Sequence, residues 1–349
     1  MKTFGRGKQS AGHWLNVPAL LMIAGLVLLS GVFACRATED GGPAATPTPP
    51  TATPPTATEI PATPTPTEPA SPTPTPVTPT PTPAPVAPAG DLLGLQAALQ
   101  AEVDSYWQAG NYAFAVRDLQ TGETVGVYGD RPQLSACIAN LFVLLRATLD
   151  VQEGRLSLDQ VDGLIAATTW SSNATTAWQL FGVVGGRDVL EGVRRVGELT
   201  TALELLDTVI DHPPAYDGYS LGISRDNWIT AEDANRALDA IWSGDLLEPQ
   251  WRDYLLAHLE NVKPGLNYLT ASLPARVSHK NGFFPYSGGY VDNDAGIVRF
   301  VIGGQEYAFA ITFLSEEVPV KYGDIPLGQT LARMTYEFFV TRYSVASGQ

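Results

Sequence analysis

The stretch 137–145 constrains the fold most, because it is apolar on almost every side. It reads Cys-Ile-Ala-Asn-Leu-Phe-Val-Leu-Leu, and a helix of that kind must be buried at the centre of a domain. Two polar groups interrupt it, the thiol of Cys137 and the amide of Asn140. They are three residues apart and therefore share one helix face. A nucleophile and its partner would take that arrangement in a catalytic site.

Composition divides the chain into unequal parts. Of the 28 prolines among 349 residues, 18 lie between Pro43 and Pro88. The formal net charge of −15 makes a nucleic-acid backbone an unfavourable partner. The two cysteines, Cys35 and Cys137, exclude a disulfide framework, and no bridge is expected between regions so different. Metal-binding and phosphate-binding motifs are absent from the sequence, so neither a metal nor a cofactor is expected.

Residues 1–35 predict a lipoprotein signal peptide. Three cations within the first eight residues precede an apolar run over 15–34, which ends at Ala34 and Cys35. This ending resembles a bacterial lipobox, which implies cleavage before Cys35 and a diacylglycerol on its sulfur. The alternative is an uncleaved transmembrane anchor, since the run is about 20 residues long. Both interpretations place the rest of the chain outside the cytoplasm, attached to the cell membrane.

Residues 36–90 form a Thr/Pro tract without aromatic side chains. Such a segment has no apolar surface to bury and is expected to be disordered. Dense proline favours extended polyproline II, so the tract would span up to roughly 140 Å as a semi-rigid spacer. We expect it to carry the following domain into or through a wall layer. A recognition motif for a partner domain is the alternative.

Residues 91–345 are predicted to fold as one domain. The apolar periodicity predicts helices over 92–106, 137–145, 174–180, 188–196, 230–244, 251–262 and 327–342, with a capping box at 157–160. Alternating patterns and turn residues predict strands over 112–119, 124–128, 276–283, 297–302 and 307–313. The predicted fold is α+β, an α/β sandwich with an antiparallel sheet of about five strands. The sheet part comprises 91–130 and 273–345, and the helical part 131–272 is inserted between them.

This order resembles the serine β-lactamase and penicillin-binding D,D-peptidase superfamily, and most closely its class A. The stretch 112–123 resembles the opening hairpin, and 137–145 the helix that begins with Ser-x-x-Lys. Residues 171–173 are similar to the Ser-Asp-Asn motif. Residues 279–282, followed by 293–298, are similar to the Lys-Thr-Gly strand and its neighbour. The resemblance implies a β-lactamase/transpeptidase-like fold and acyl-enzyme chemistry.

In that alignment Cys137 stands at the nucleophile and Asn140 at the lysine. An amide cannot carry the proton that the family's lysine takes or orients. A thiol needs less help than a hydroxyl, because its pKa starts near 8.5 and falls at a helix N-terminus. The two interpretations of Cys137 are a reactive thiol and a small buried side chain with no reaction to perform.

The resemblance also assigns the substrate-holding positions around the Ser-Ser-Asn stretch. Ser171 matches the serine that relays a proton to the leaving nitrogen, and Asn173 the residue that holds the substrate amide. Ser172 replaces an aspartate that mainly braces the loop. An ordinary helix N-cap is the compatible alternative for this stretch.

The strand motif supplies the expected anion site. Lys280 matches the cation that attracts the substrate carboxylate, and Asn281 replaces a hydroxyl residue that binds it. Gly282 lets the ligand approach the strand. The backbone N–H groups of Cys137 and Phe283 would form the oxyanion hole, which needs no particular side chain. The alternative for Lys280 is an exposed lysine at a strand end.

The loop that carries the class A deacylation glutamate corresponds to residues 205–214, which contain no Glu-x-x-x-Asn pattern. Asp207 and Asp211 are candidates to replace it, and solvated loop carboxylates are the alternative. His212 could pair with Cys137 as a base, although nothing in the sequence brings the two together.

The expected protein is therefore an extracytoplasmic β-lactamase/D,D-peptidase-like hydrolase. Its ligand would be a β-lactam or a D-Ala-D-Ala-type peptidoglycan stem peptide, and its catalysis would be weak or lost through the changes at Cys137 and Asn140. The alternative is a non-catalytic surface lipoprotein that binds wall peptide or is purely structural. The sequence carries no signal for an oligomeric state.

Overall fold

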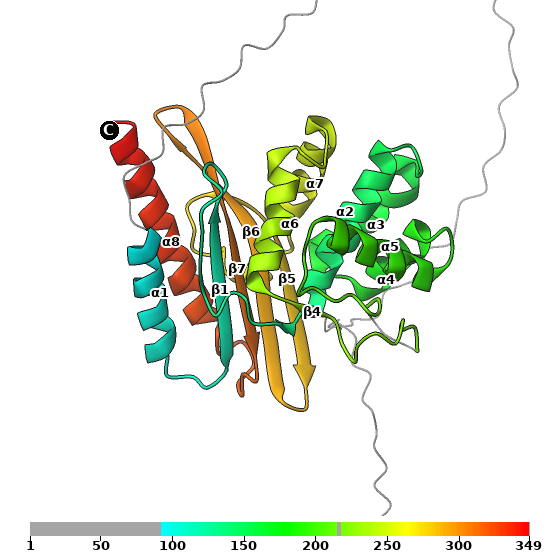
Figure 1. Ribbon diagram of the computed structural model, residues 1–349, viewed down its shortest axis with the longest axis horizontal. Coiled ribbons are helices and arrows are strands. Elements are labelled where there is room, and N and C mark those ends of the chain that lie inside the picture. The colour runs from blue at the N-terminus through cyan, green and yellow to red at the C-terminus, as the bar shows by residue number, and fades with distance from the viewer. Residues whose placement is uncertain (1–91, 215–217, 349) are drawn as a thin grey trace, which may run out of the picture. The chain divides into compact units, whose positions relative to one another are not determined.

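A computed structural model describes residues 92–214 and 218–348, so the predicted signal peptide and Thr/Pro spacer lie outside it. The described chain forms an antiparallel five-stranded sheet with helices packed on both faces (Figure 1). The α+β fold class predicted from the sequence is thereby confirmed.

The elements follow the predicted order of a helix, two strands, a helical block, three strands and a helix. The helices are α1 (Leu92–Ser105), η1 (Ala136–Ile138), α2 (Ala139–Gln152), α3 (Leu158–Ser171), α4 (Ala174–Val184), α5 (Val189–Ala202), α6 (Ala231–Ser243), α7 (Pro249–Glu260) and α8 (Ile325–Ala346). The strands are β1 (Asn111–Asp118), β2 (Thr124–Val127), β3 (Gln133–Leu134), β4 (Trp228–Ile229), β5 (Arg276–Tyr286), β6 (Gly289–Ile302) and β7 (Gln305–Glu316). Among these described helices, none combines the length and apolarity required to cross a bilayer.

The sheet order is β2-β1-β7-β6-β5. β1 pairs with β7 from Asn111 opposite Glu316 to Asp118 opposite Phe309, so the two ends of the domain meet in one sheet. The helical part is inserted between them, as the sequence predicts. β5 is left at the edge of the sheet, where it contacts η1 and α7 of the helical part.

Each face of the sheet has its own apolar core. On one face α1 and α8 lie side by side (Figure 1), and Phe309 of β7 stacks on Phe339 of α8 with ring centroids 4.6 Å apart. On the other face α2 is the centre of the helical part. Residues 141–145 are all fully buried there, which confirms the central position that their all-round apolarity predicts.

Three local features differ from the sequence prediction. The central helix begins with the short turn η1 before α2. β6 begins at Gly289 rather than at residue 297, because the polar residues 292–294 are buried in the sheet and conceal the strand pattern. A two-stranded pair, β3 with β4, joins Gln133 to Ile229 beside the main sheet. The β3–β4 pair joins segments about a hundred residues apart, which local periodicity does not report.

Candidate active site

The helix start that carries Cys137 and Asn140 is buried against the sheet. Ala136 opens it with φ 45°, a left-handed conformation that is unusual for a residue with a Cβ. Cys137 is 2% exposed and Asn140 is fully buried. The structure therefore places both residues in the interior, one turn apart, as their spacing predicts.

β5 passes this helix start in direct backbone contact. A Cβ added to Gly282 would lie 2.9 Å from the backbone nitrogen of Cys137 and 3.2 Å from that of Ile138. Only glycine fits so close an approach. Phe283 follows Gly282 directly, so the predicted pair of oxyanion donors, the N–H groups of Cys137 and Phe283, belongs to two segments in contact.

Lys280 lies one pleat before Gly282, on the same face of β5. It is 1% exposed, so it is not the exposed strand-end lysine of the alternative interpretation. Its Nζ lies 2.5 Å from Ser172 Oγ and 2.6 Å from the Asn281 carbonyl oxygen. Burial lowers the pKa of Lys280 to about 7, and the nearby carboxylate of Asp294 only partly opposes this shift.

The junction between α3 and α4 brings Ser172 to Lys280, which corrects the sequence prediction by one residue. Ser171 ends α3, and its hydroxyl donates to the carbonyl of Ala167 in the same helix. Ser172 turns the chain in the left-handed region with φ 52° and ψ 39°. That turn points its hydroxyl to β5, where it donates to Asn281 Oδ1 at 3.2 Å. Ser172, rather than Ser171, is therefore the serine that contacts Lys280.

Asn173 serves as the N-cap of α4. Its side-chain oxygen accepts a hydrogen bond from the Thr176 backbone nitrogen at 3.1 Å, while the residue itself is exposed. This matches the capping alternative. The amide oxygen is thus already engaged, and the next residue, Ala174, has no polar group to offer a substrate.

The outer end of β5 carries an aromatic cluster. Phe283 lies with its ring centroid 5.1 Å from that of Tyr322 and 6.0 Å from that of Tyr290. The ammonium of Lys321 lies over Phe283, 5.1 Å from the ring centroid. A cation and three rings therefore flank the strand segment just after the glycine.

The two polar positions on the central helix, Cys137 and Asn140, are both buried. Cys137 lies at the start of this helix, and Cys35, the other cysteine of the chain, lies outside the described residues. The amide of Asn140 has no hydrogen-bond partner at either polar atom among the described residues. A buried unpaired amide is destabilising, and it cannot accept a proton.

In the loop before α6, polar residues form hydrogen bonds that stabilise the loop itself. Asp211 is buried, and its Oδ1 accepts from the backbone nitrogen of Ile223 at 2.7 Å. His212 Nδ1 contacts the Pro213 carbonyl at 2.9 Å. The backbone nitrogen of Asp207 donates to Asp233 at 3.1 Å. Asp211 is therefore a structural carboxylate rather than a solvated one.

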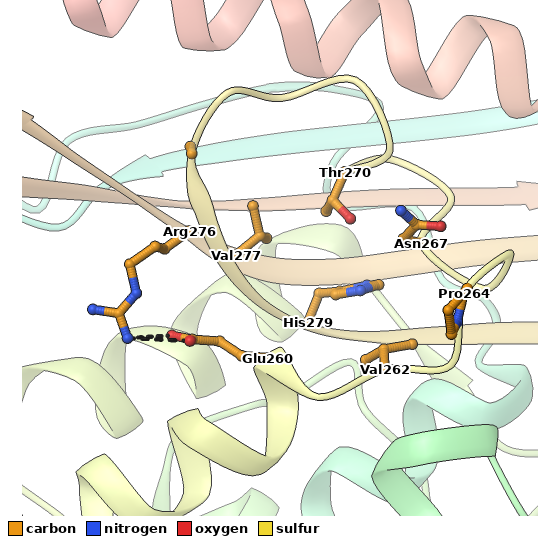
Figure 2. A pocket seen from close by; sticks show the side chains of 9 residues that line it. Glu260, Val262, Pro264, Asn267, Thr270, Arg276, Val277 and His279 are labelled. Atoms are coloured by element: carbon orange, nitrogen blue, oxygen red, sulfur yellow. Dashed lines mark hydrogen bonds and ion pairs between the residues drawn. The ribbon is translucent and has the colours of Figure 1, made fainter.

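A surface pocket of about 420 Å³ lies beside β5, between α7 and the loop over 261–275. Figure 2 shows the ion pair of Arg276 with Glu260 at one end and Asn267 at the other. His279 reaches into it from β5. Adjacent strand residues point to opposite faces, so this pocket is behind the strand from Lys280 and is separate from the Ser172 cluster.

Behind the same strand lie two buried carboxyl groups that the sequence gives no reason to pair. Asp292 of β6 stands opposite Phe283 in register, and Asp324 precedes α8. Burial and their mutual proximity raise the pKa of Asp292, and burial raises that of Asp324. Elsewhere in residues 92–214 and 218–348, no group of three or more His, Cys, Asp or Glu side chains is placed to hold a metal ion.

The five-stranded sheet, the inserted helices and the lysine strand against the central helix define the β-lactamase fold. The model of the Beta-lactamase enzyme family matches residues 94–176 and 161–339, which is more than half of the chain. The chain belongs to this family, and the predicted superfamily is confirmed. No curated protein sequence matches the chain.

Solved structures agree with this assignment at the level of the fold. A β-lactamase from Chitinophaga pinensis DSM 2588 has a TM-score of 0.61 at 20% identity, covering 70% of this chain and 98% of its own. PBP-A has a TM-score of 0.60 at 19% identity, covering 73% and 100%. A class A β-lactamase from Bacteroides cellulosilyticus DSM 14838 has a TM-score of 0.61 at 19% identity, covering 71% and 98%.

Proposed function

We propose that this domain recognises β-lactams and the D-Ala-D-Ala ends of peptidoglycan stem peptides, and that acyl transfer through Cys137 is weak or lost. The observation that carries the proposal is the buried Lys280, held by Ser172 and Asn281 beside the glycine contact with the central helix. A cationic or dipolar group at that place favours a ligand carboxylate. A mutant of PBP-A, a protein that shares the fold, is known as an acyl-enzyme complex with penicillin G.

The weakness of the Cys137 route follows from its neighbours. Asn140 stands where a proton-carrying lysine would be needed, and loss of a general base costs about 10²–10⁴-fold in rate. A binding protein without turnover, for wall peptide, is the second candidate, and the unpaired Asn140 amide favours it.

Binding is measured on the full-length chain in detergent, by fluorescence anisotropy of a fluorescent penicillin with a D-Ala-D-Ala peptide as competitor. We expect saturable binding that Lys280→Ala abolishes, while Lys263→Ala, which removes an exposed lysine, leaves it intact. Circular dichroism of each variant establishes that it is folded. Binding unaffected by Lys280→Ala, or no binding by the wild-type chain, would overturn the proposal.

Restoring the family residues tests the Cys137 route separately. We expect the double variant Cys137→Ser with Asn140→Lys to raise the yield of covalent penicillin adduct, read as intact mass. The wild-type chain and Asn140→Lys alone are the controls. No increase in a folded double variant would show that the substitutions do not limit acylation.

We also propose that the mature chain is exported and held at the cell membrane by a lipid on Cys35, with the Thr/Pro tract as spacer. The apolar run that ends at Cys35 supports this proposal. Metabolic labelling with an alkyne fatty acid is expected to mark the wild type and to fail in Cys35→Ala. An unlabelled wild-type chain whose intact mass rises on reduction would contradict it, because one sulfur cannot hold both a lipid and a disulfide.

A further inference from the structure

The cluster of Ser172, Lys280 and Asn281 contains a hydroxyl and an amine in direct hydrogen-bond contact. Ser172 Oγ and Lys280 Nζ are 2.5 Å apart, and they come from the α3–α4 junction and from β5. The structure brings these groups together across more than a hundred residues of chain. The resemblance to the Ser-x-x-Lys helix assigns the nucleophile position to Cys137. It gives Ser172 and Lys280 no role as nucleophile and base.

Lys280 is an unusual buried cation because no carboxylate lies within ion-pair distance of it among the described residues. A buried ammonium without a paired carboxylate is disfavoured, and the neutral amine is favoured instead. In the structure Lys280 Nζ donates to Ser172 Oγ and to the Asn281 carbonyl oxygen, while Ser172 Oγ donates to Asn281 Oδ1. The short contact between Oγ and Nζ is the path along which a neutral amine would take the hydroxyl proton during reaction. The pKa of Lys280, lowered to about 7 by burial, suits a base that works near neutral pH.

The backbone at Ser172 is itself constrained. A serine in the left-handed region costs free energy, and the surrounding structure must hold it there. The strained turn directs the hydroxyl at the amine instead of into α3, where Ser171 Oγ bonds to a carbonyl. Ser172 is 7% exposed, whereas Lys280 and Asn281 are at most 2% exposed. The hydroxyl is thus the member of the cluster nearest to solvent.

The N-terminus of α4, which follows Ser172, adds an electrostatic field that favours negative charge. α4 begins at Ala174 and runs for 11 residues. Its Asn173 cap takes up the Thr176 N–H, and the first intrahelical bond is donated by Ala177. The N–H groups at this end carry the positive pole of the helix dipole, which stabilises negative charge developing next to Ser172.

We propose that Ser172 is the nucleophile of this domain and that Lys280 is its general base. The inference rests on the proposed function for the class of substrate, which is an acyl compound with a β-lactam or D-Ala-D-Ala amide. Lys280 takes the hydroxyl proton as Ser172 Oγ bonds to the carbonyl carbon. The carbon–nitrogen bond then breaks, and the leaving nitrogen takes that proton from Lys280. Water adds to the resulting ester, giving one proton to Lys280, and the serine oxygen leaves and regains it.

A fluorophosphonate provides a probe that does not depend on the natural ligand. Ser172 Oγ would bond to phosphorus as the phosphorus–fluorine bond breaks, with fluoride leaving and the hydroxyl proton passing to Lys280. The full-length chain in detergent is labelled, digested and mapped by mass spectrometry. We expect the label on Ser172, its loss in Ser172→Ala, and unchanged labelling in the matched control Ser171→Ala. A folded wild-type chain without label on Ser172 would overturn the proposal.

The pH profile of the wild-type labelling rate tests the base without a variant that could fail to fold. The charged group that acts on the amine is the carboxylate of Asp294 in β6, which partly opposes the effect of burial. We expect the rate to rise about tenfold per pH unit and to level off above about pH 7. Lys280→Met, verified as folded by circular dichroism, should lower the rate by about 10²-fold or more. A rate independent of pH between about 5 and 9 would refute the role of Lys280.

The binding and labelling measurements separate the two proposals. Binding of D-Ala-D-Ala peptide without any label on Ser172 would leave the proposed function standing and remove the nucleophile. Labelling of Ser172 without binding of β-lactam or peptide would keep the nucleophile and remove the proposed ligand class.

Discussion

Gly282 and Cys137 are in backbone contact, so that the edge strand and the start of the central helix share one surface. A methyl group on Gly282 would lie 2.9 Å from the Cys137 nitrogen and 3.1 Å from the Ala136 Cβ. Neither neighbour is the flexible end of a side chain. β5 can therefore lie this close to the start of the central helix only because residue 282 has no side chain.

Gly282→Ala should separate β5 from the helix start. Overpacking of this kind typically costs about 1–3 kcal/mol, and it displaces the two backbone N–H groups expected to hold an oxyanion. We expect a lower melting temperature and loss of penicillin binding, measured by circular dichroism and anisotropy. Gly163→Ala in α3 is the control, because its Cβ would meet no atom within 4 Å. Equal stability of the two variants would contradict the contact.

Two variants of Asn173 distinguish a role in capping α4 from a role in substrate binding. Asn173→Ala should cost about 1 kcal/mol of stability, because the Thr176 N–H loses its acceptor. Asn173→Asp keeps an acceptor oxygen and should retain the wild-type stability in urea unfolding. Retained stability with lost ligand binding in Asn173→Asp would instead support the substrate-holding role that the sequence predicts.

Asn140→Leu should stabilise the domain. The buried amide has no partner at either polar atom, and an unsatisfied buried group costs about 1–3 kcal/mol. We expect a higher denaturation midpoint in urea. Asn235→Leu is the matched control: Asn235 is also fully buried, but its Oδ1 accepts from Thr312 Oγ1 at 2.8 Å, so its removal should destabilise. A loss of stability in Asn140→Leu would show that the amide has a partner in solution.

The buried pair Asp292 and Asp324 predicts stability that declines as pH rises. The folded pKa of each carboxyl is raised, so the folded state retains protons that the unfolded chain releases above about pH 4. The unfolded state then binds fewer protons than the folded one, and the free energy of unfolding falls with increasing pH.

We expect a decrease of about 1–3 kcal/mol between pH 5 and pH 8 in wild-type urea unfolding. Asp292→Asn should flatten this decrease, since an amide does not ionise. Asp245→Asn, at an exposed position, should leave the slope unchanged. A wild-type stability that rises over this range would be inconsistent with raised pKa values for the pair.

Much of this domain is readable from the sequence because its strongest signals are local. The apolar run over 141–145 predicts a buried central helix, and the order of strands and helices predicts one sheet with a helical insertion. The glycine at 282 and the lysine at 280 indicate the strand that faces this helix. These features depend on composition and spacing within short windows.

The site differs from the sequence prediction where contacts between distant segments determine which side chains meet. Ser171 and Ser172 are chemically identical neighbours, and only the left-handed turn at Ser172 determines which hydroxyl reaches Lys280. The buried pair of Asp292 and Asp324 comes from β6 and the start of α8, which no local pattern connects. The tertiary structure determines which residue of a turn points into the site and which distant carboxyl groups come together.

The pairing of β1 with β7 has a consequence for how the domain reaches its folded state. Asn111 and Glu316 are joined across the whole helical part, so during synthesis β1 emerges long before its partner. Until β7 arrives, one edge of β1 is open to pairing with other chains. Contacts of such long range make folding slow. The nascent chain would therefore need protection from aggregation until its last strand has been synthesised.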